Sequence, residues 1–413
     1  MPALARFADL RLAVVSPFLD RRHGTERCIA EQLERFIKEP GAEIHLYSQR
    51  VEDVAGVVFY PESPSGSIVW HRVPRLPGPH ILGYIWWFVA NRFQRWWDTT
   101  IHGLKFDLVY SAGINALDAD FISIHILFAE FYRRVRPRLT LSSVSILRWP
   151  VILHRRLYYR FICLLERLIY PRKQTALTGI SRHTSECVQQ FFGRDDVVVI
   201  RYGVDTKTFD PRARLERRQS ARELFRLAPG DFCLLLIGND WKNKGLDSLL
   251  LAVSACSDIE LRLLVVGSDD RRSYADAVRS LNLQYRVQFL DSSSDVMQFY
   301  AAADAYVGPS LEDAYGLPIL EAMACGLPII ASARAGASEI VRHGENGFVL
   351  QDPEDSRELA GLLRSLHTDA ALRERLADEA ARTAARETWD RNAADTWELL
   401  QLTYARKAKA GAD

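Results

Sequence analysis

The stretch that decides the fold is Pro309–Pro328, which reads PSLEDAYGLPILEAMACGLP and follows an apolar strand, Ala305–Val307. Two adjacent carboxylates, Glu312 and Asp313, precede a Gly-Leu-Pro turn, and the helix after this turn contains a third carboxylate, Glu321. This order places acidic side chains and backbone amides at the carboxyl end of a strand, where open α/β sheets bind their ligands. The amides bind anions and the carboxylates accept hydrogen bonds from hydroxyl groups. The stretch therefore predicts a site for a ligand that combines phosphate with several hydroxyl groups, such as a nucleotide sugar.

These residues resemble the signature of the retaining glycosyltransferases of family 4, whose fold is called GT-B. The family pattern is Glu-x7-Glu, then Ala-Met-Ala-x-Gly-x-Pro, then a Gly-Gly-x-x-Glu-like turn, which here reads Gly336-Ala337-Ser338-Glu339. The resemblance is dense from about Val287 to Asp352 and thinner over the rest of the chain. It implies an α/β protein of the GT-B fold, in which two Rossmann-like domains face each other across a cleft.

The composition is typical of a globular protein with two domains. A length of 413 residues favours two domains, and 48% hydrophobic with 25% charged residues excludes disordered and collagen-like classes. The six cysteines form no Cys-x-x-Cys pair, which argues against a zinc site or a disulfide framework and favours a reducing compartment. The first residues lack the apolar core of a signal peptide, and the longest apolar run, Ile81–Ala90, is about half a membrane span. We therefore expect a cytoplasmic protein without a transmembrane helix.

Strand-like runs alternate with helical patterns along the whole chain, which is typical of doubly wound parallel sheets. In the first half these runs are Arg11–Ser16, Glu43–Ser48, Ile68–Val73, Asp107–Ser111, Phe121–Ile126 and Thr175–Ile180. In the second half they are Phe232–Gly238, Leu261–Gly267, Val287–Leu290, Ala305–Val307, Pro328–Ala331 and Gly347–Leu350. Two comparable series of strands predict two Rossmann-like domains.

The resemblance also implies where the domains begin and end. Tyr202–Asp205 and Phe209–Pro211 look like the interdomain segment of the family, and Thr388–Tyr404 is similar to its final helix. We therefore expect an acceptor-binding domain at 1–200, a nucleotide-sugar-binding domain at 201–385, and a terminal segment, 386–413, that returns to the first domain.

The loop Gly238–Gly245 offers cations for a diphosphate. The family has Gly-Arg-x4-Lys-Gly at this place, and Lys244 matches its lysine. Asn239 stands at the arginine position, which removes a fixed positive charge, and Lys242 is the substitute that we expect. Some lipopolysaccharide-core glucosyltransferases resemble this loop more closely. The alternative is that Lys244 is only a surface lysine at the start of a helix.

The acidic stretch supplies the other contacts that the resemblance implies for the donor. Glu321 would accept hydrogen bonds from the ribose hydroxyls, and Asp313, where the family has the longer Glu, would meet the donor sugar. The backbone amides of Gly316 and Leu317 would meet sugar or phosphate. The alternative is a solvated loop and a helix cap.

Two residues of the first domain are included in the predicted site. Gly24 opens a helix at a turn where the family has Gly-Gly and this chain has His23-Gly24, and His125 ends a strand where the family places a histidine near the donor sugar. The fingerprint Gly-x-Gly-x-x-Gly is absent, which counts against an ordinary nicotinamide dehydrogenase. The acids of Asp118-Ala119-Asp120 are interpreted as turn chemistry rather than as metal ligands, so we expect neither a metal nor another cofactor.

The mechanism implied by the resemblance retains the configuration of the sugar. The acceptor hydroxyl attacks from the face of the leaving phosphate, which takes the proton, so no protein nucleophile is required. The predicted catalytic residues are His125, Lys244 and Asp313, which act by positioning and by charge stabilisation.

Two segments favour contact with an anionic membrane surface. Residues 81–97 interleave aromatic residues with arginines, and residues 131–173 contain eleven basic residues and a single acid, Glu166. The alternative is that the aromatic residues pack in the core and the arginines form a solvated face. Arginine-rich patches also bind nucleic acid, but no nucleic-acid-binding motif accompanies this one, so no nucleic acid partner is expected.

The sequence thus favours a metal-independent retaining glycosyltransferase that transfers a hexose-type sugar from a nucleoside diphosphate to a saccharide or lipid-linked acceptor. Its expected context is cell-envelope glycan synthesis at the inner face of the membrane. The alternatives are a GT-B epimerase or phosphorylase, and a catalytically degenerate partner protein, which the changes at Asn239, Asp313 and His23 would explain. The donor nucleotide (UDP, GDP or ADP), the sugar, the acceptor and the oligomeric state are left open.

Overall fold

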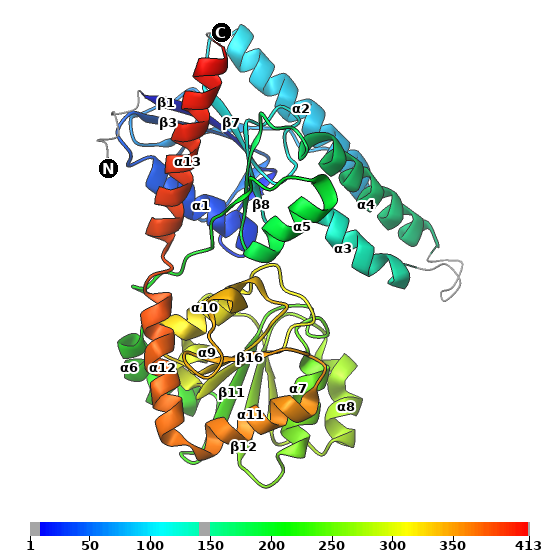
Figure 1. The fold of residues 1–413 in the computed structure, drawn as a ribbon, viewed down its shortest axis with the longest axis vertical. Helices are drawn as coiled ribbons and strands as arrows, with labels where there is room; N and C mark the ends of the chain where they lie inside the picture. Colours follow the sequence, from blue (N-terminus) through cyan, green and yellow to red (C-terminus); the bar gives the residue numbers. More distant parts are fainter. Residues whose placement is uncertain (1–8, 140–148, 412–413) are drawn as a thin grey trace. The chain divides into compact units, whose positions relative to one another are not determined.

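The computed structural model describes residues 9–139 and 149–411, and the chain forms two compact units (Figure 1). The first unit consists of Met1–Arg201 together with Trp389–Asp413, and the second of Tyr202–Thr388. The first unit is therefore discontinuous in sequence, because the chain returns to it after completing the second.

The described residues of the first unit contain an eight-stranded sheet with the order β10-β9-β8-β7-β1-β3-β6-β5, in which every pair is parallel. Its strands are β1 (Leu10–Val15), β3 (Ala42–Ser48), β5 (Val57–Phe59), β6 (Ile68–Arg72), β7 (Leu108–Ala112), β8 (Phe121–Ile124), β9 (Ala176–Gly179) and β10 (Val198–Val199). Two further strands, β2 (Phe18–Leu19) and β4 (Arg50–Val51), pair with each other. All six strands predicted for this half are present, within two residues of the predicted ends.

Helices cover both faces of this sheet. They are α1 (Gly24–Phe36), α2 (His80–Thr100), α3 (Phe128–Val135), α4 (Trp149–Ile169), α5 (Arg182–Phe192) and α13 (Trp389–Ala410), with a short 3-10 helix at Arg136–Arg138. The alternating side chains of β1 divide the core: Leu12 packs with α1 and α13, whereas Ala13 packs with α2, α4 and α5.

The second unit has a six-stranded parallel sheet with the order β13-β12-β11-β14-β15-β16. Its strands are β11 (Phe232–Ile237), β12 (Leu261–Val266), β13 (Val287–Leu290), β14 (Ala305–Gly308), β15 (Ile329–Ser332) and β16 (Phe348–Leu350). Its helices are α6 (Pro211–Leu224), α7 (Leu246–Ala255), α8 (Ala275–Ser280), α9 (Met297–Ala302), α10 (Leu317–Ala324), α11 (Ser356–Thr368) and α12 (Ala370–Ala384), with 3-10 helices at Arg271–Tyr274 and Gly336–Ile340. The six predicted strands of this half are all present.

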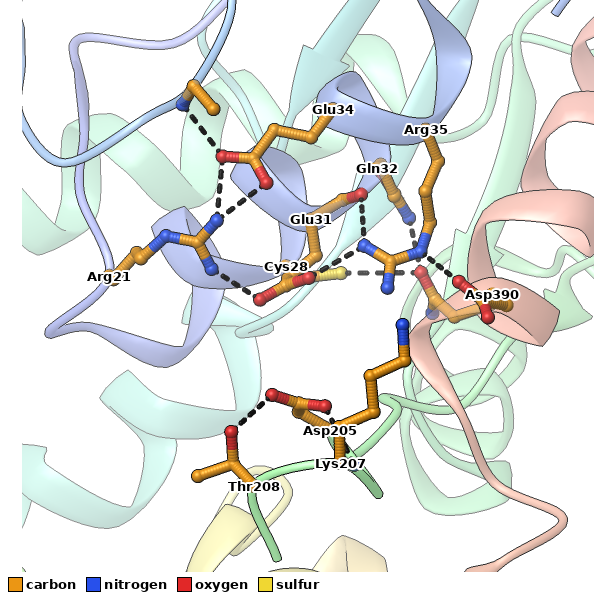
Figure 2. A network of polar contacts seen from close by, with 12 residues as sticks. Arg21, Cys28, Glu31, Gln32, Glu34, Arg35, Asp205, Lys207, Thr208 and Asp390 are labelled. Carbon is orange, nitrogen blue, oxygen red and sulfur yellow. Dashed lines mark hydrogen bonds and ion pairs between the residues drawn. The ribbon is translucent and has the colours of Figure 1, made fainter. Parts of the chain in front are cut away.

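The terminal helix α13 is bound to α1 of the first unit by one buried and one exposed polar contact. The amide of Gln32 donates to the Asn392 oxygen at 2.9 Å, and the Arg35 guanidinium donates to the Asp390 carboxylate at 2.6 Å. Figure 2 shows how Glu31 lies between Arg35 and Arg21, which extends this network along α1. The contacts fix the end of the chain to the unit in which it began.

Candidate functional site

The candidate site of the second unit lies at the carboxyl ends of β11 and β14, where two loops are joined by hydrogen bonds. The loop after β11 contains Asn243, whose side-chain amide donates to the Glu312 carbonyl at 2.7 Å. Its own carbonyl accepts from the Leu311 amide, also at 2.7 Å. Asn243 thus holds the lysine-containing loop against the acidic stretch.

Lys244 and Asp313 form an ion pair between these two loops. The lysine side chain is 19% exposed and the aspartate 16%, so the pair is largely withdrawn from solvent. The aliphatic part of the Lys244 side chain packs against Gly238. A Cβ added at Gly238 would lie 2.7 Å from Cε of Lys244. A side chain at position 238 would therefore require the Lys244 side chain to shift, and the φ of +142° at this position also favours glycine.

The acidic stretch is also bonded to the turn that contains Gly336. The amide of Asp313 donates to the Arg334 carbonyl and the amide of Gly336 donates to the Asp313 carbonyl, each at 3.2 Å. The Ala337 amide donates to the Tyr315 carbonyl at 2.6 Å. Three loops that are separated in sequence thus form one edge of the site, and the predicted turn is part of it.

Helix α10 begins at this edge. Gly316, at its N-cap, has φ of +89°, a conformation that L side chains rarely adopt, and a proline follows within the first turn. The positive end of the helix therefore faces the place where Lys244 and Asp313 meet, which favours an anion there.

Glu321 lies one turn further along α10 and is only 5% exposed. One of its carboxylate oxygens accepts a hydrogen bond of 2.8 Å from the hydroxyl of Tyr300, which is fully buried. Burial raises the pKa of Tyr300 well above its ordinary value, so the phenol keeps its proton and remains the donor. Tyr300 thus fixes the orientation of the Glu321 carboxylate.

The remainder of the β11 loop is bonded to the loop after β12. The Asn239 side-chain oxygen accepts from the Ser268 amide at 2.9 Å. The Asp269 carboxylate accepts from the amides of Asp240 and Trp241, at 3.1 and 2.6 Å. Asn239 therefore has a structural contact at the position predicted for donor binding, whereas Lys242 is exposed.

His125 and Gly24 lie in the first unit, where His125 directly follows β8 and Gly24 begins the first helix after β1 and β2. The Nε2 atom of His125 is 2.9 Å from the Ser123 hydroxyl, and burial lowers the pKa of His125 to about 3. The imidazole is therefore neutral at physiological pH. Gly24 begins α1, and the preceding His23 is bonded through Nδ1 to the buried Asp20 at 2.9 Å.

The acids of the Asp-x-Asp sequence are bonded to cations of the first unit. Asp118 pairs with Arg95 at 2.8 Å and also with Arg92, and Asp120 pairs with Lys407 of α13 at 2.8 Å. These are structural ion pairs rather than solvated turn chemistry, because Arg95 is buried and Lys407 joins α13 to the residue that precedes β8. Within residues 9–139 and 149–411, no group of three His, Cys, Asp or Glu side chains is arranged to hold a metal ion.

Sequence reasoning missed three residues of this site: Asn243, Asp269 and Tyr300. Asn243 lies between two lysines of the loop that was predicted to bind a diphosphate. Its position in the sequence could therefore have indicated a role in the site. Asp269 and Tyr300 belong to other loops and helices, and only the folded sheet brings them to the site.

Residues 218–383 match the family model described as Glycosyl transferases group 1. The chain is 33% identical over 212 residues to D-inositol 3-phosphate glycosyltransferase of Rhodococcus erythropolis, covering 46% of this chain and 48% of the relative. It is 29% identical over 202 residues to lipopolysaccharide glucosyltransferase WaaG of Escherichia coli, covering 47% and 51%. The chain thus spans about half the length of the curated relatives it matches.

Solved structures resemble the chain over almost its whole length. The crystal structure of WaaG superposes with a TM-score of 0.73 at 19% identity, covering 94% of this chain and 99% of that one. The structure of Anabaena Alr3699/HepE in complex with UDP-glucose gives 0.64 at 20% identity, covering 94% and 99%. The protein is therefore an α/β protein of the GT-B fold. Residues 218–383 are similar to the glycosyl transferases group 1 family.

Proposed function

We propose that the protein is a metal-independent, retaining glycosyltransferase that transfers a hexose-type sugar from a nucleoside diphosphate to a saccharide or lipid-linked acceptor. The observation that carries this proposal is the Lys244–Asp313 pair, which lies beside the start of α10 and near Glu321. A fixed cation, helix amides and a carboxylate at one sheet edge match the diphosphate and the hydroxyl groups of a nucleotide sugar.

The second-unit residues have distinct roles in this proposal. Lys244 exchanges its bond to Asp313 for one to the diphosphate, and Asp313 then accepts a hydrogen bond from the donor sugar. The amides of Gly316 and Leu317 bind sugar or phosphate, and Glu321 accepts from the ribose hydroxyls. Because Tyr300 already orients Glu321, little conformational entropy is lost when the ribose binds.

The transfer step follows from these contacts. The bond between the anomeric carbon and the phosphate oxygen breaks, the acceptor hydroxyl attacks from the same face, and its proton passes to the leaving phosphate. Lys244 stabilises the negative charge that develops, and Lys242 provides a second cation on the same loop. In the first unit, Gly24 begins α1, and His125, being neutral, offers a hydrogen bond rather than a charge.

UDP is the donor nucleotide that we propose first, since the HepE structure of the same fold contains UDP-glucose. The names of two relatives, which act on inositol phosphate and on lipopolysaccharide, support an acceptor in cell-envelope glycan synthesis. Such an acceptor would bring a cytoplasmic enzyme to the inner face of the membrane.

Calorimetric titration of the full chain with UDP, GDP and ADP, with and without EDTA, tests the donor site. We expect tight binding of one nucleotide, unchanged by EDTA, and at least a tenfold loss of affinity in Lys244→Ala because a charge-assisted contact is removed. Lys38→Ala, which removes an exposed lysine of the first unit, is the matched control and should bind normally. Absence of binding to every nucleotide contradicts the proposal.

The degenerate partner protein is kept as a second candidate because Asn239 bonds to Ser268 instead of supplying a charge. Once the donor nucleotide is known, turnover of its sugar with envelope extracts as acceptor distinguishes the two candidates. Product NMR then reports the anomeric configuration, and inversion would contradict a retaining mechanism. Nucleotide binding without any turnover would favour the partner protein.

A further inference from the structure

Helix α2 has apolar side chains on its outer side as well as on the side that faces the sheet. Trp87 and Phe88 point into the core of the first unit. The opposite side is defined here as the outer face of α2, and it consists of Leu82, Ile85, Val89, Phe93, Trp96 and Trp97. These positions recur every three or four residues, so they form one continuous stripe along the helix. A helix that is apolar on both sides requires a second apolar environment.

Helix α4 repeats this pattern with arginines added. Leu153, Leu157, Leu164 and Leu168 are exposed and form what we define as the outer face of α4. Arg160 and Arg167 fall between these leucines at helical spacing and are also exposed. The inner side of the same helix, which includes Leu165 and Ile169, packs in the core cluster that also contains Trp87.

The two helices lie side by side and run in the same direction (Figure 1). His80 meets His154 with ring centroids 6.4 Å apart, and Tyr84 meets Tyr158 at 5.8 Å. Since both helices bury their inner sides in one core cluster, both outer faces point away from it. Together they leave ten large apolar side chains between 40% and 58% exposed, far more than scattered surface residues explain.

The charges of this surface all have one sign. Residues 149–173 contain six arginines and lysines and one acid, Glu166, which is fully buried. The acid of α2, Asp98, is buried as well, whereas Arg92 is exposed and pairs with Asp118. Residues 140–148, which belong to the basic stretch 131–173, lie outside the described residues.

We propose that the outer faces of α2 and α4 bind an anionic lipid bilayer, with both helix axes parallel to its surface. No helix of the described residues is long and apolar enough to cross a membrane. Apolar side chains would enter the acyl boundary, the paired Trp96 and Trp97 would lie at head-group level, and Arg160 and Arg167 would reach lipid phosphates. A second copy is a poorer occupant, because like charges of two α4 helices would face each other.

Co-sedimentation of the full chain with vesicles tests this surface and needs no nucleotide, so its outcome is independent of the proposed enzyme activity. Vesicles of phosphatidylcholine mixed with phosphatidylglycerol should bind the protein, and pure phosphatidylcholine should bind it much less. Arg160→Gln with Arg167→Gln should weaken binding about thirty-fold, at about 1 kcal/mol per arginine and about 1.4 kcal/mol per factor of ten. The matched control is Arg212→Gln with Arg357→Gln, two exposed arginines of the second unit, which should bind normally.

A second pair of variants tests how much the apolar side chains contribute to vesicle binding. Trp96→Ser with Trp97→Ser should reduce binding to both kinds of vesicle, whereas Leu251→Ser with Leu402→Ser, at exposed leucines of α7 and α13, should not. Lack of binding by the wild-type chain overturns the proposal, as does normal binding by both α2 and α4 variants. A wild-type dimer that these variants convert to a monomer also overturns it, and would assign the surface to a second copy.

Discussion

Gly238 shows how one backbone position limits the path of a charged side chain in the candidate site. Its φ of +142° is rarely adopted by L residues, and a Cβ there would lie 2.7 Å from Cε of Lys244. We predict that Gly238→Ala displaces the Lys244 ammonium from Asp313 and lowers turnover about a hundredfold, since a shift of about 1 Å in a catalytic group costs that much. Steady-state kinetics with the donor identified by titration measure this effect.

The control for this variant is Gly344→Ala in the same unit. Gly344 also has a positive φ, +78°, but nothing lies within 4 Å of its added Cβ. Both variants should lose about 1–3 kcal/mol of stability through backbone strain. Only Gly238→Ala should lose turnover, and equal turnover in the two variants would contradict a positioning role for Gly238.

Residue types and spacing were sufficient to predict that Lys244 and Asp313 lie in loops on one side of the second sheet. Lys244 and Asp313 lie in loops that follow strands, and parallel strands bring such loops to one edge. The spacing could not predict that Asn239 would bond to Ser268, because an amide side chain serves equally as a ligand contact or as a loop brace. Asp269 was not predicted because its contact depends on the loop after β12 lying beside the loop after β11.

At the scale of elements, the end of α4 and the start of α3 are joined by one buried carboxylate. Glu166 accepts hydrogen bonds from the amides of Phe128 and Ala129, both at 2.7 Å, at the N-terminus of α3. Burial raises the pKa of Glu166 to about 7, although these two hydrogen bonds oppose the shift. In the unfolded chain Glu166 has its ordinary pKa of 4.5. The folded protein therefore keeps the Glu166 proton at pH values where the unfolded chain has released it.

The sign of the resulting pH dependence follows from linkage. Between about pH 4.5 and pH 7 the folded state binds more protons than the unfolded state, so the contribution of Glu166 to stability falls as the pH rises. We predict that wild-type protein loses up to a few kcal/mol, at about 1.4 kcal/mol per pKa unit, relative to Glu166→Gln between about pH 5 and about pH 8. Urea unfolding midpoints across this range measure the difference.

The control is Glu39→Gln, which removes an exposed carboxylate of the same unit. Its pH dependence should follow that of the wild type. If the Glu166→Gln midpoint also fell with pH as steeply as the wild-type midpoint, the carboxylate would be ionised in the folded protein at all these pH values.

The elements themselves were largely predictable because buried parallel strands are continuous apolar runs. The strands β2, β4 and β10 were not predicted, since each has only two residues, too few to show a hydrophobic pattern. β5 was missed as well: its three residues are not buried, so they lack the hydrophobic pattern of the central strands. Both α2 and α4 depart from the usual amphipathic pattern, because each has exposed apolar side chains on the side that faces away from the core.

At the scale of the whole molecule, the last two helices of the chain, α12 and α13, pack in the cores of different units. Leu376 of α12 is fully buried in the core of the second unit. Trp397 of α13, only twenty-one residues later in the sequence, packs in the core of the first unit with its ring 5.0 Å from Phe36. The final helices of the chain thus stabilise two different cores.

This arrangement predicts that two neighbouring substitutions destabilise different units. Trp397→Ala should cost the first unit about 3–5 kcal/mol and Leu376→Ala should cost the second about 2–5 kcal/mol, because each leaves a buried cavity. Amide hydrogen exchange followed by mass spectrometry separates the effects. Exchange should accelerate in peptides of β1 and β3 for Trp397→Ala, and in peptides of β11 and β14 for Leu376→Ala. Each variant is the control for the other, since both lie in the last helices of the chain. Acceleration in all four strands by either substitution would mean that the units unfold together, and that α13 stabilises the whole chain rather than the first core.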